Sequence, residues 1–402
     1  MGKVILICLL LVVMAMNLAA CGANNENSTP ETTAPENTTG EKGPPSVKVA
    51  FITNLSVGGA TEQGLCSRDG FLLAVDEINA KGGINGTMIK PVIYDDEASP
   101  EKAVEYVTRA IDQDGVVAIT GFVNSGNALA SMSLAQEAGI PMLVNYATAT
   151  DITTYYQDEE KNYIFRYSLN DKDQVDIMLD FVKNSNFEKI ALLHDTSGYG
   201  VNGANDIKKG MEERGINYHM IDTLNLNDTD MTTQLNKFKN AGVDCVMTYC
   251  LSPENANVLL SAKKIDYNPV MISTWNVGFT TFERLAGEAR NESFYFTTAY
   301  SVGQTAMSSY VHETLIEKNG HDILPIASAF GYDSMNMIIR AMVEAKSLDP
   351  EAIRDSLENM QKFDGCVGVI EKPFSKTDHE AISGDHIYLA QYKNNIIVPV
   401  SK

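Results

Sequence analysis

The amino-acid sequence predicts an α/β protein, with helices packed around a parallel sheet, and three observations support this. Short apolar runs rich in β-branched residues alternate with segments whose apolar residues recur at helical spacing. The alternation begins at residue 47 and continues through most of the chain. Residues 116–145 contain a strand, a helix and a second strand, and a helix connecting parallel strands forms a right-handed crossover. Strands alternating with helices are typical of parallel sheets.

Residues 1–20 have the pattern of an export signal. Lys3 precedes an apolar run over residues 4–16, which is too short for a comfortable membrane span and is typical of a signal-peptide core. The run leads to Leu18-Ala19-Ala20-Cys21, which resembles the bacterial lipobox, in which the cysteine receives lipid and becomes the mature N-terminus. We therefore expect lipidation at Cys21 and anchoring to the bacterial cell membrane. The alternative is a plain secretory signal cleaved near Ala20.

Residues 21–46 are expected to be a lipidated cysteine followed by a disordered tether. The segment is rich in Asn, Thr, Glu, Pro and Gly and has almost no apolar residues, so it cannot offset its ordering entropy. The rest of the 402-residue chain is long enough for two domains at about 150 residues each. A net charge of −21 and the lack of a basic patch in the sequence argue against nucleic-acid binding.

The first strand and helix of the folded part are expected at residues 47–53 and 64–80. A glycine-containing loop joins them, and Gly82-Gly83 ends the helix. A second strand is expected at 89–94, and Ser99-Pro100 begins the next helix.

A candidate binding site follows the next two strands, at 116–121 and 141–145. Their loops, Asn124-Ser125-Gly126 and Tyr146-Ala147-Thr148, carry hydroxyl groups, and ligands of parallel sheets bind at the carboxyl ends of the strands. The first loop also begins a helix, whose free N–H groups favour an anion. We predict that Ser125 and Thr148 bind one small carboxylate. The alternative is that Ser and Asn before a helix are only N-caps.

A second βα series begins near residue 170. Its expected strands lie at 189–194, 218–224, 245–249, 270–273 and 294–298, with helices at 171–185, 201–214, 231–241 and 254–264. Three further helices are expected at 310–318, 327–345 and 350–360, and two strand-like segments at 368–371 and 387–392. The chain therefore makes more helices than a single sheet needs.

Several motifs together resemble the type I periplasmic binding proteins, and among them the leucine/isoleucine/valine-binding group of ABC importers. They are AVDEINAKGGING at 74–86, the acidic pair Asp95-Asp96 followed by Ser99-Pro100, and GIPM at 139–142. The resemblance covers residues 47–392. It implies two Rossmann-like lobes, each a parallel sheet flanked by helices, joined by three hinge crossovers near 169–170, 298–300 and 363–365. Lobe one is then expected to comprise residues 47–169 with 300–363, and lobe two residues 170–299 with 364–402.

The resemblance also implies roles for site residues. In amino-acid-binding members a serine and a threonine hold the ligand's carboxylate, and Ser125 and Thr148 stand at the matching positions. The backbone carbonyl of Tyr146 matches one that accepts from the ligand's ammonium. Tyr199 matches an aromatic residue of lobe two that covers the ligand, and Asp171 matches an aspartate near a crossover.

The sequence departs from the family pattern at several pocket positions. The acidic partner of the ammonium falls at Thr274, so either Asp171 or Asp333 supplies the charge or the ligand lacks an ammonium. Two aromatic positions fall at Leu251 and Gln63. Trp275, the only tryptophan, is expected to refill that space, with a core position as the alternative.

We expect a monomeric solute-binding lipoprotein that delivers a branched-chain or other apolar amino acid to ABC permease subunits. A surface receptor with the same fold, or a binder of an amine-free acid or amide, is the alternative. Enzyme motifs such as a P-loop or a zincin helix are absent from the sequence, so no catalytic residues, cofactor or metal are expected. Cys66, Cys245, Cys250 and Cys366 lack a CxxC spacing and are expected to be buried thiols, with a disulfide as the alternative.

Overall fold

The computed structural model describes residues 44–58 and 60–400. The expected signal peptide, Cys21 and most of the expected tether lie outside the described residues. Within the described residues, no helix is both long enough and apolar enough to cross a membrane.

A five-stranded parallel sheet forms the centre of lobe one, in the order β2-β1-β3-β4-β5. Its strands are β1 (Ser46–Thr53), β2 (Met88–Asp95), β3 (Ala118–Gly121), β4 (Met142–Val144) and β5 (Ile164–Arg166). The helices of this lobe are α1 (Thr61–Ala80), α2 (Pro100–Arg109), α3 (Ser125–Ala138), α4 (Asp151–Thr154), α10 (Ala306–Asn319), α11 (Pro325–Ala345) and α12 (Pro350–Glu358).

Alternate residues of β1 explain why helices cover both faces of this sheet. Val49 and Phe51 belong to the hydrophobic cluster that contains residues of α1, α10 and α11. Ala50 and Ile52 belong to the cluster that contains residues of α2 and α3. A strand buried on both faces is apolar throughout rather than alternating, as its sequence VKVAFIT largely is.

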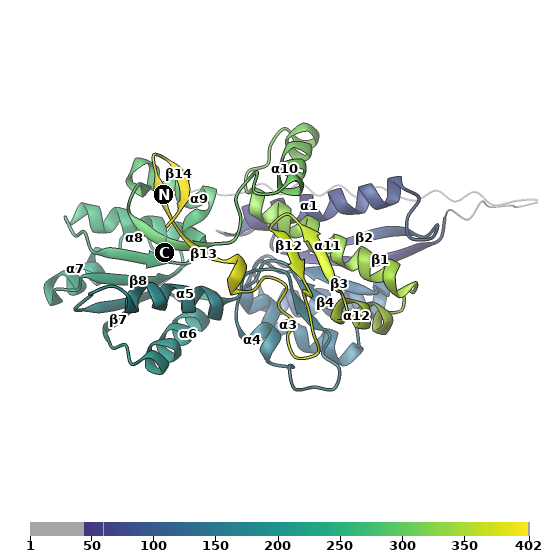
Figure 1. Cartoon of the computed structure of the whole chain (residues 1–402), viewed down its shortest axis with the longest axis horizontal. Coiled ribbons are helices and arrows are strands. Elements are labelled where there is room, and N and C mark those ends of the chain that lie inside the picture. The colour runs from purple at the N-terminus through teal and green to yellow at the C-terminus, as the bar shows by residue number, and fades with distance from the viewer. Residues whose placement is uncertain (1–43, 59, 401–402) are drawn as a thin grey trace, which may run out of the picture. The chain divides into compact units, whose positions relative to one another are not determined.

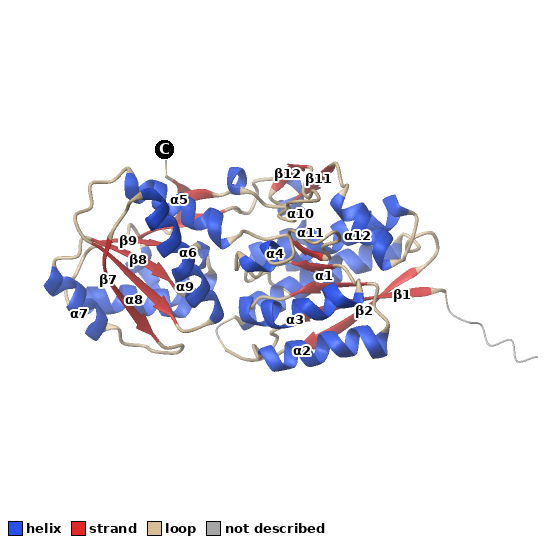
Figure 2. Cartoon of the chain, turned by 90° about the horizontal axis from the view of Figure 1, so that it is seen from below, coloured by secondary structure: helices blue, strands red, loops and turns tan. Residues whose placement is uncertain are grey.

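A seven-stranded sheet forms the centre of lobe two, in the order β14-β13-β10-β9-β8-β6-β7. Its strands are β6 (Ile190–Asp195), β7 (Tyr218–Leu224), β8 (Cys245–Tyr249), β9 (Val270–Ser273), β10 (Phe294–Thr298), β13 (Tyr388–Lys393) and β14 (Ile396–Pro399). The strands are parallel except β13 and β14, which pair antiparallel. Helices α5 (Asp171–Lys183), α6 (Gly198–Arg214), α7 (Thr232–Ala241), α8 (Ser252–Lys264) and α9 (Thr280–Ala286) flank this sheet (Figures 1 and 2).

Short elements complete the described chain. A two-stranded antiparallel ribbon consists of β11 (Lys362–Gly365) and β12 (Gly368–Glu371). A π-helical turn extends α2 over Ala110–Asp114, and 3₁₀ turns lie at Trp275–Gly278, Gly287–Arg290 and Gly384–His386. The patterns in the sequence did not predict β5, α4, α9, β11 or β14. Each has seven residues or fewer, which is too short for a clear periodic pattern.

The segment after β12 packs on lobe one before the chain enters lobe two. The backbone N–H of Arg166 in β5 donates to the carbonyl of His379 at 2.9 Å, and the N–H of Ala381 donates to the carbonyl of Arg166 at 3.0 Å. Phe374 and Ile382 belong to the lobe-one hydrophobic cluster. We therefore propose that the third crossover lies after residue 382, later than the 363–365 expected from the sequence.

A buried ion pair joins this segment to lobe one. The side chain of Arg166 is fully buried, and its Nε donates to the carboxylate of Glu380 at 2.7 Å. Its Nη1 donates to the carbonyl of Ala149 at 2.7 Å. Arg166 therefore holds in place the loop that carries Thr148.

Removing Glu380 should destabilise the fold, because the buried guanidinium would lose its counterion. Breaking a buried pair from one side typically costs ~3–5 kcal/mol, and Glu380→Ala is expected to lower the free energy of unfolding by about that amount in a urea titration. Glu351→Ala is the control, because its pair with Lys161 is exposed and exposed pairs contribute ~1 kcal/mol or less. Equal losses in the two variants would contradict this role for the buried pair.

Candidate functional site

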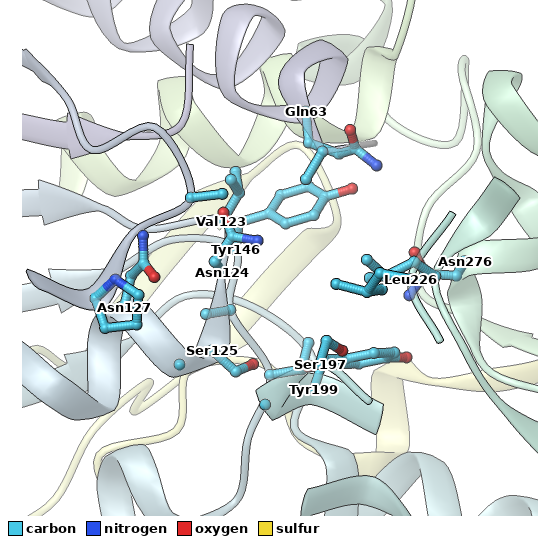
Figure 3. Close-up of a pocket in the computed structure, with 18 of the residues that line it drawn as sticks. Gln63, Val123, Asn124, Ser125, Asn127, Tyr146, Ser197, Tyr199, Leu226 and Asn276 are labelled. Carbon is cyan, nitrogen blue, oxygen red and sulfur yellow. The ribbon is translucent and has the colours of Figure 1, made fainter. Parts of the chain in front are cut away.

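A cavity of about 200 Å³ lies where the carboxyl ends of both sheets meet. Its lobe-one wall comes from residues that follow β1, β2, β3 and β4, and its lobe-two wall from residues that follow β6, β7, β8 and β9. Figure 3 shows side chains from both walls around this space. A cavity of ~150 Å³ in another protein accommodates benzene, so this space suits a small ligand.

The loop between β3 and α3 turns sharply before it reaches the cavity. Gly121 has φ +119°, and a Cβ atom there would lie 2.3 Å from the carbonyl oxygen of Ile52. Phe122 follows with φ +66°, a left-handed conformation that is uncommon for a bulky residue. Such strained backbone persists where the surrounding structure determines it, and here the fully buried Phe122 ring does so. The turn places Asn124 and Ser125 in the cavity wall.

The two predicted hydroxyl residues, Ser125 and Thr148, both line the cavity. Ser125 is the first residue of α3 and is 2% exposed, and its Oγ accepts from the N–H of Ala149 at 3.3 Å. Asn124 occupies the N-cap position, but its side chain makes no capping hydrogen bond. The alternative that these side chains serve only as N-caps is therefore wrong for Asn124. The hydrogen bond between Ser125 and Ala149 joins the two loops directly.

Three helices begin at the cavity. Ser125 opens α3 in lobe one, Gly198 opens α6 in lobe two, and Leu251 is the N-cap of α8. Helix N-termini carry a partial positive charge and unpaired N–H groups, which favour an anion. A Cβ atom on Gly198 would lie only 3.2 Å from Cα of Gly126, so a glycine there lets the ends of α3 and α6 approach closely.

Tyr199 and Trp275 form part of the lobe-two wall. The Tyr199 hydroxyl lies 2.5 Å from the Thr274 hydroxyl, which fixes its ring against the cavity. The Trp275 ring is 2% exposed and packs against Tyr146 of lobe one, with ring centroids 4.6 Å apart. It also packs against Phe330 of lobe one at 6.0 Å. Trp275 is thus both a cavity residue and part of an aromatic contact between the lobes.

Two predicted site residues do not line the cavity. Asp171 is the first residue of α5 and is fully buried behind Thr148, whose carbonyl accepts from the Asp171 N–H at 2.8 Å. Burial raises the pKa of its carboxyl to about 7, while the nearby hydroxyls of Thr148 and Tyr249 act in the opposite direction. Thr274 is also fully buried and reaches the cavity only through its hydrogen bond to Tyr199.

Asp333, the other proposed partner of a ligand ammonium, also lies away from the cavity lining. Its carboxylate accepts from the Tyr167 hydroxyl at 2.5 Å and from the N–H of Cys366 at 2.6 Å. Burial raises the pKa of this carboxyl to about 7. Among the described residues that line the cavity, none has a charged side chain.

The structure brings most of the predicted positions together and adds residues that sequence reasoning missed. The predicted residues in the cavity lining are Gln63, Asn124, Ser125, Tyr146, Ala147, Thr148, Tyr199, Leu251 and Trp275. Ser197, Leu226 and Asn276 also line it and were not predicted. Ser197 and Leu226 follow β6 and β7 directly, so the rule that ligands bind at the carboxyl ends of strands could have identified them.

The four cysteines of the described chain, Cys66, Cys245, Cys250 and Cys366, are buried and free, as predicted. No group of side chains suited to hold a metal ion occurs within residues 44–58 and 60–400.

Comparisons with known proteins agree with this architecture. The family described as periplasmic binding protein matches residues 46–395. The leucine-, isoleucine-, valine-, threonine-, and alanine-binding protein of Pseudomonas aeruginosa is 28% identical over 317 residues, which cover 78% of this chain and 82% of that protein. The Leu/Ile/Val-binding protein of Escherichia coli K12 is 27% identical over 60% of this chain and 65% of its own length. A periplasmic binding protein type 1 from Bordetella pertussis has the same fold, with a TM-score of 0.79 over 88% of this chain and 100% of that one, at 24% identity.

The hydroxyl groups of Ser125 and Thr148 should each contribute to carboxylate binding. Ser125→Ala and Thr148→Ala are expected to weaken binding of a branched-chain acid by ~1.5–3 kcal/mol each, the range for hydrogen bonds to charged groups. Calorimetric titration measures this, with Ser131→Ala as the control. Ser131 lies in the same helix, but its Oγ donates to the carbonyl of Asn127 at 2.7 Å and does not line the cavity. The assignment fails if the methyl ester binds as tightly as the acid.

Proposed function

The chain belongs to the type I periplasmic binding proteins, in the group that includes the Leu/Ile/Val-binding proteins, and from this premise we propose that it is the extracytoplasmic solute-binding component of an ABC importer. It is a binding protein and not an enzyme. Its ligand is a small apolar carboxylic acid, held in the cavity between the lobes.

One observation carries the proposal. The cavity combines two buried hydroxyl groups, Ser125 and Thr148, with the N-termini of α3, α6 and α8 at the carboxyl ends of two parallel sheets. Hydroxyls and helix N-termini together are suited to hold a carboxylate.

The rest of the lining supports an apolar ligand. Val123, Leu226 and Leu251 contribute aliphatic side chains, and Tyr199 and Trp275 contribute aromatic faces. The printed names of the relatives favour a branched-chain or other apolar amino acid. The lack of a charged side chain among the described lining residues favours the alternative, an amine-free acid or an amide.

Binding is expected to couple to closure of the lobes. Contacts between lobes include the Thr150 hydroxyl donating to Asp206 at 2.7 Å and the Thr281 hydroxyl donating to Glu62 at 2.6 Å. A ligand that touches both walls stabilises the closed form, in which these contacts exist, and so shifts the population toward that form. The crossovers between lobes would act as the hinges. A closed, ligand-bound form is the state that permease subunits would recognise.

Titration with branched-chain acids, amino acids included, tests the proposed function. One molecule per chain is expected to bind. The fluorescence of Trp275, the only tryptophan, is expected to change because its ring lines the cavity. At a ligand concentration 100 times the dissociation constant, binding should stabilise the folded state by ~2.7 kcal/mol, visible as a rise in melting temperature. Steady turnover of a bound acid, or no binding by any of them, would refute the proposal.

We further propose that Cys21 carries the lipid that anchors the protein to the membrane, on the evidence of Leu18–Cys21 behind an apolar core. Cys21→Ser is expected to move the protein from the membrane fraction to the soluble fraction, because acyl chains supply the attachment. Cys66→Ser is the control, since that thiol is buried within the fold. A Cys21 variant that stays with washed membranes would contradict lipidation at this residue.

A further inference from the structure

Buried polar atoms without a partner occur on the lobe-one wall of the cavity. Gln63 Oε1, Asn124 Oδ1, the Tyr146 hydroxyl and Asn127 Nδ2 have no hydrogen-bond partner among the described residues. Gln63 and Tyr146 are each 4% exposed, Asn127 is 1% exposed, and all four residues line the cavity. Asn127 Nδ2 only donates, so it is suited to the ligand's carboxylate, whereas the other three atoms can accept a hydrogen bond. Figure 3 shows the Gln63 amide and the end of the Tyr146 ring on the same side of the pocket. Because buried polar groups in native proteins are almost always hydrogen-bonded, these atoms point to polar groups on a ligand.

The chemistry of these atoms defines what the ligand must bring. Two of them, Gln63 Oε1 and Asn124 Oδ1, are amide oxygens, which only accept hydrogen bonds. The Tyr146 hydroxyl accepts or donates. A carboxylate, which only accepts, cannot pair with the amide oxygens. A second group that donates a hydrogen bond is therefore required on the ligand, apart from the carboxylate held near Ser125.

The electrostatics of the cavity disfavour a cation as that donor. None of the described lining residues is charged. Asp171 and Asp333, the two carboxyls considered as partners of a ligand ammonium, do not line the cavity. Asp333 already accepts from Tyr167 and from the N–H of Cys366. The N-termini of α3, α6 and α8 carry partial positive charge, which would repel an ammonium in the same small space. A buried ammonium would thus lack a counterion on the protein.

We propose that the ligand is an apolar carboxylic acid that carries an uncharged hydrogen-bond donor, a hydroxyl or an amide N–H, where an amino acid carries its ammonium. Gln63 and Tyr146 select this group, and Ser125 and Thr148 hold the carboxylate. The inference rests on the proposed function and narrows its ligand class from amino acids to 2-hydroxy or N-acyl acids.

Four acids test the proposal, and three of them differ only in the group at the 2-position. The full-length protein is titrated at one pH and salt concentration with L-leucine, with (S)-2-hydroxy-4-methylpentanoate and with 4-methylpentanoate. N-Acetyl-L-alanine is a fourth probe, which separates an amide donor from a hydroxyl. The hydroxy acid or the N-acyl acid is expected to bind at least tenfold more tightly than both leucine and 4-methylpentanoate. If leucine binds as tightly as the hydroxy acid or the N-acyl acid, whichever of those two binds more tightly, the inference is overturned and the solute-binding function stands. Failure of all four acids to bind would refute both this inference and the proposed solute-binding function.

Substitution of Gln63 provides a second test within the same ligand series. Gln63→Glu keeps the shape of the side chain and adds a carboxylate, and its place in the first turn of α1 tolerates an acidic residue. In Gln63→Glu, the ratio of the affinity for leucine to the affinity for the hydroxy acid is expected to rise at least tenfold over that of the unmodified protein. Gln63→Leu should remove the advantage of the hydroxy acid over 4-methylpentanoate.

Gln361→Glu is the matched control, because it adds the same charge at an exposed position outside the cavity lining. It should leave the order of affinities unchanged. An unchanged order in Gln63→Glu and Gln63→Leu, with both variants folded by circular dichroism, would overturn the assignment of Gln63. If neither variant folds, Tyr146→Phe is titrated with the same acids. An unchanged order of affinities in that variant would overturn the assignment of the Tyr146 hydroxyl.

Discussion

The cavity depends on the direction of the parallel strands in both sheets. Every strand in a parallel set ends at the same edge, so the loops that follow β1 to β4 lie together, and so do those that follow β6 to β9. The helices that follow those loops necessarily begin at the same edges. The positive ends of α3, α6 and α8 therefore converge on one small space without any charged side chain in its described lining.

The approach of the two lobes depends on residue size at two contacts. Gly198 and Gly126 let the first turns of α6 and α3 meet, and a Cβ atom on Gly198 would crowd the other helix. At the second contact, Trp275 of lobe two packs on Tyr146 and Phe330 of lobe one. Because Tyr146 and Trp275 also line the cavity, the same rings contact both the ligand space and the other lobe. A ligand in this cavity would therefore touch side chains that also join the two lobes.

The net charge of the whole protein does not determine the electrostatics of its cavity. The chain has a net charge of −21, yet three helix N-termini, which favour an anion, begin at the cavity. Charges separated by more than about 10 Å of solvent are screened at ordinary salt concentrations, whereas helix N-termini act within the first turn. The buried guanidinium of Arg166 is neutralised by Glu380, so it supports the Thr148 loop mechanically rather than by adding charge to the ligand space.

The sequence alone determined the α/β class, most of the strands and the two hydroxyl loops, because these follow from local periodicity and from the ends of parallel strands. Ser125 and Thr148 could be paired from the sequence because their strands, β3 and β4, are neighbours in both sequence and sheet. Elements of a few residues, such as β5 with its buried Arg166, carry too little pattern to be read. Only the tertiary structure decided that Asp171 and Thr274 lie behind the wall while Asn276 forms part of it. Those positions depend on how the two lobes pack against each other, and contacts between residues far apart in the chain leave no local signal in the sequence.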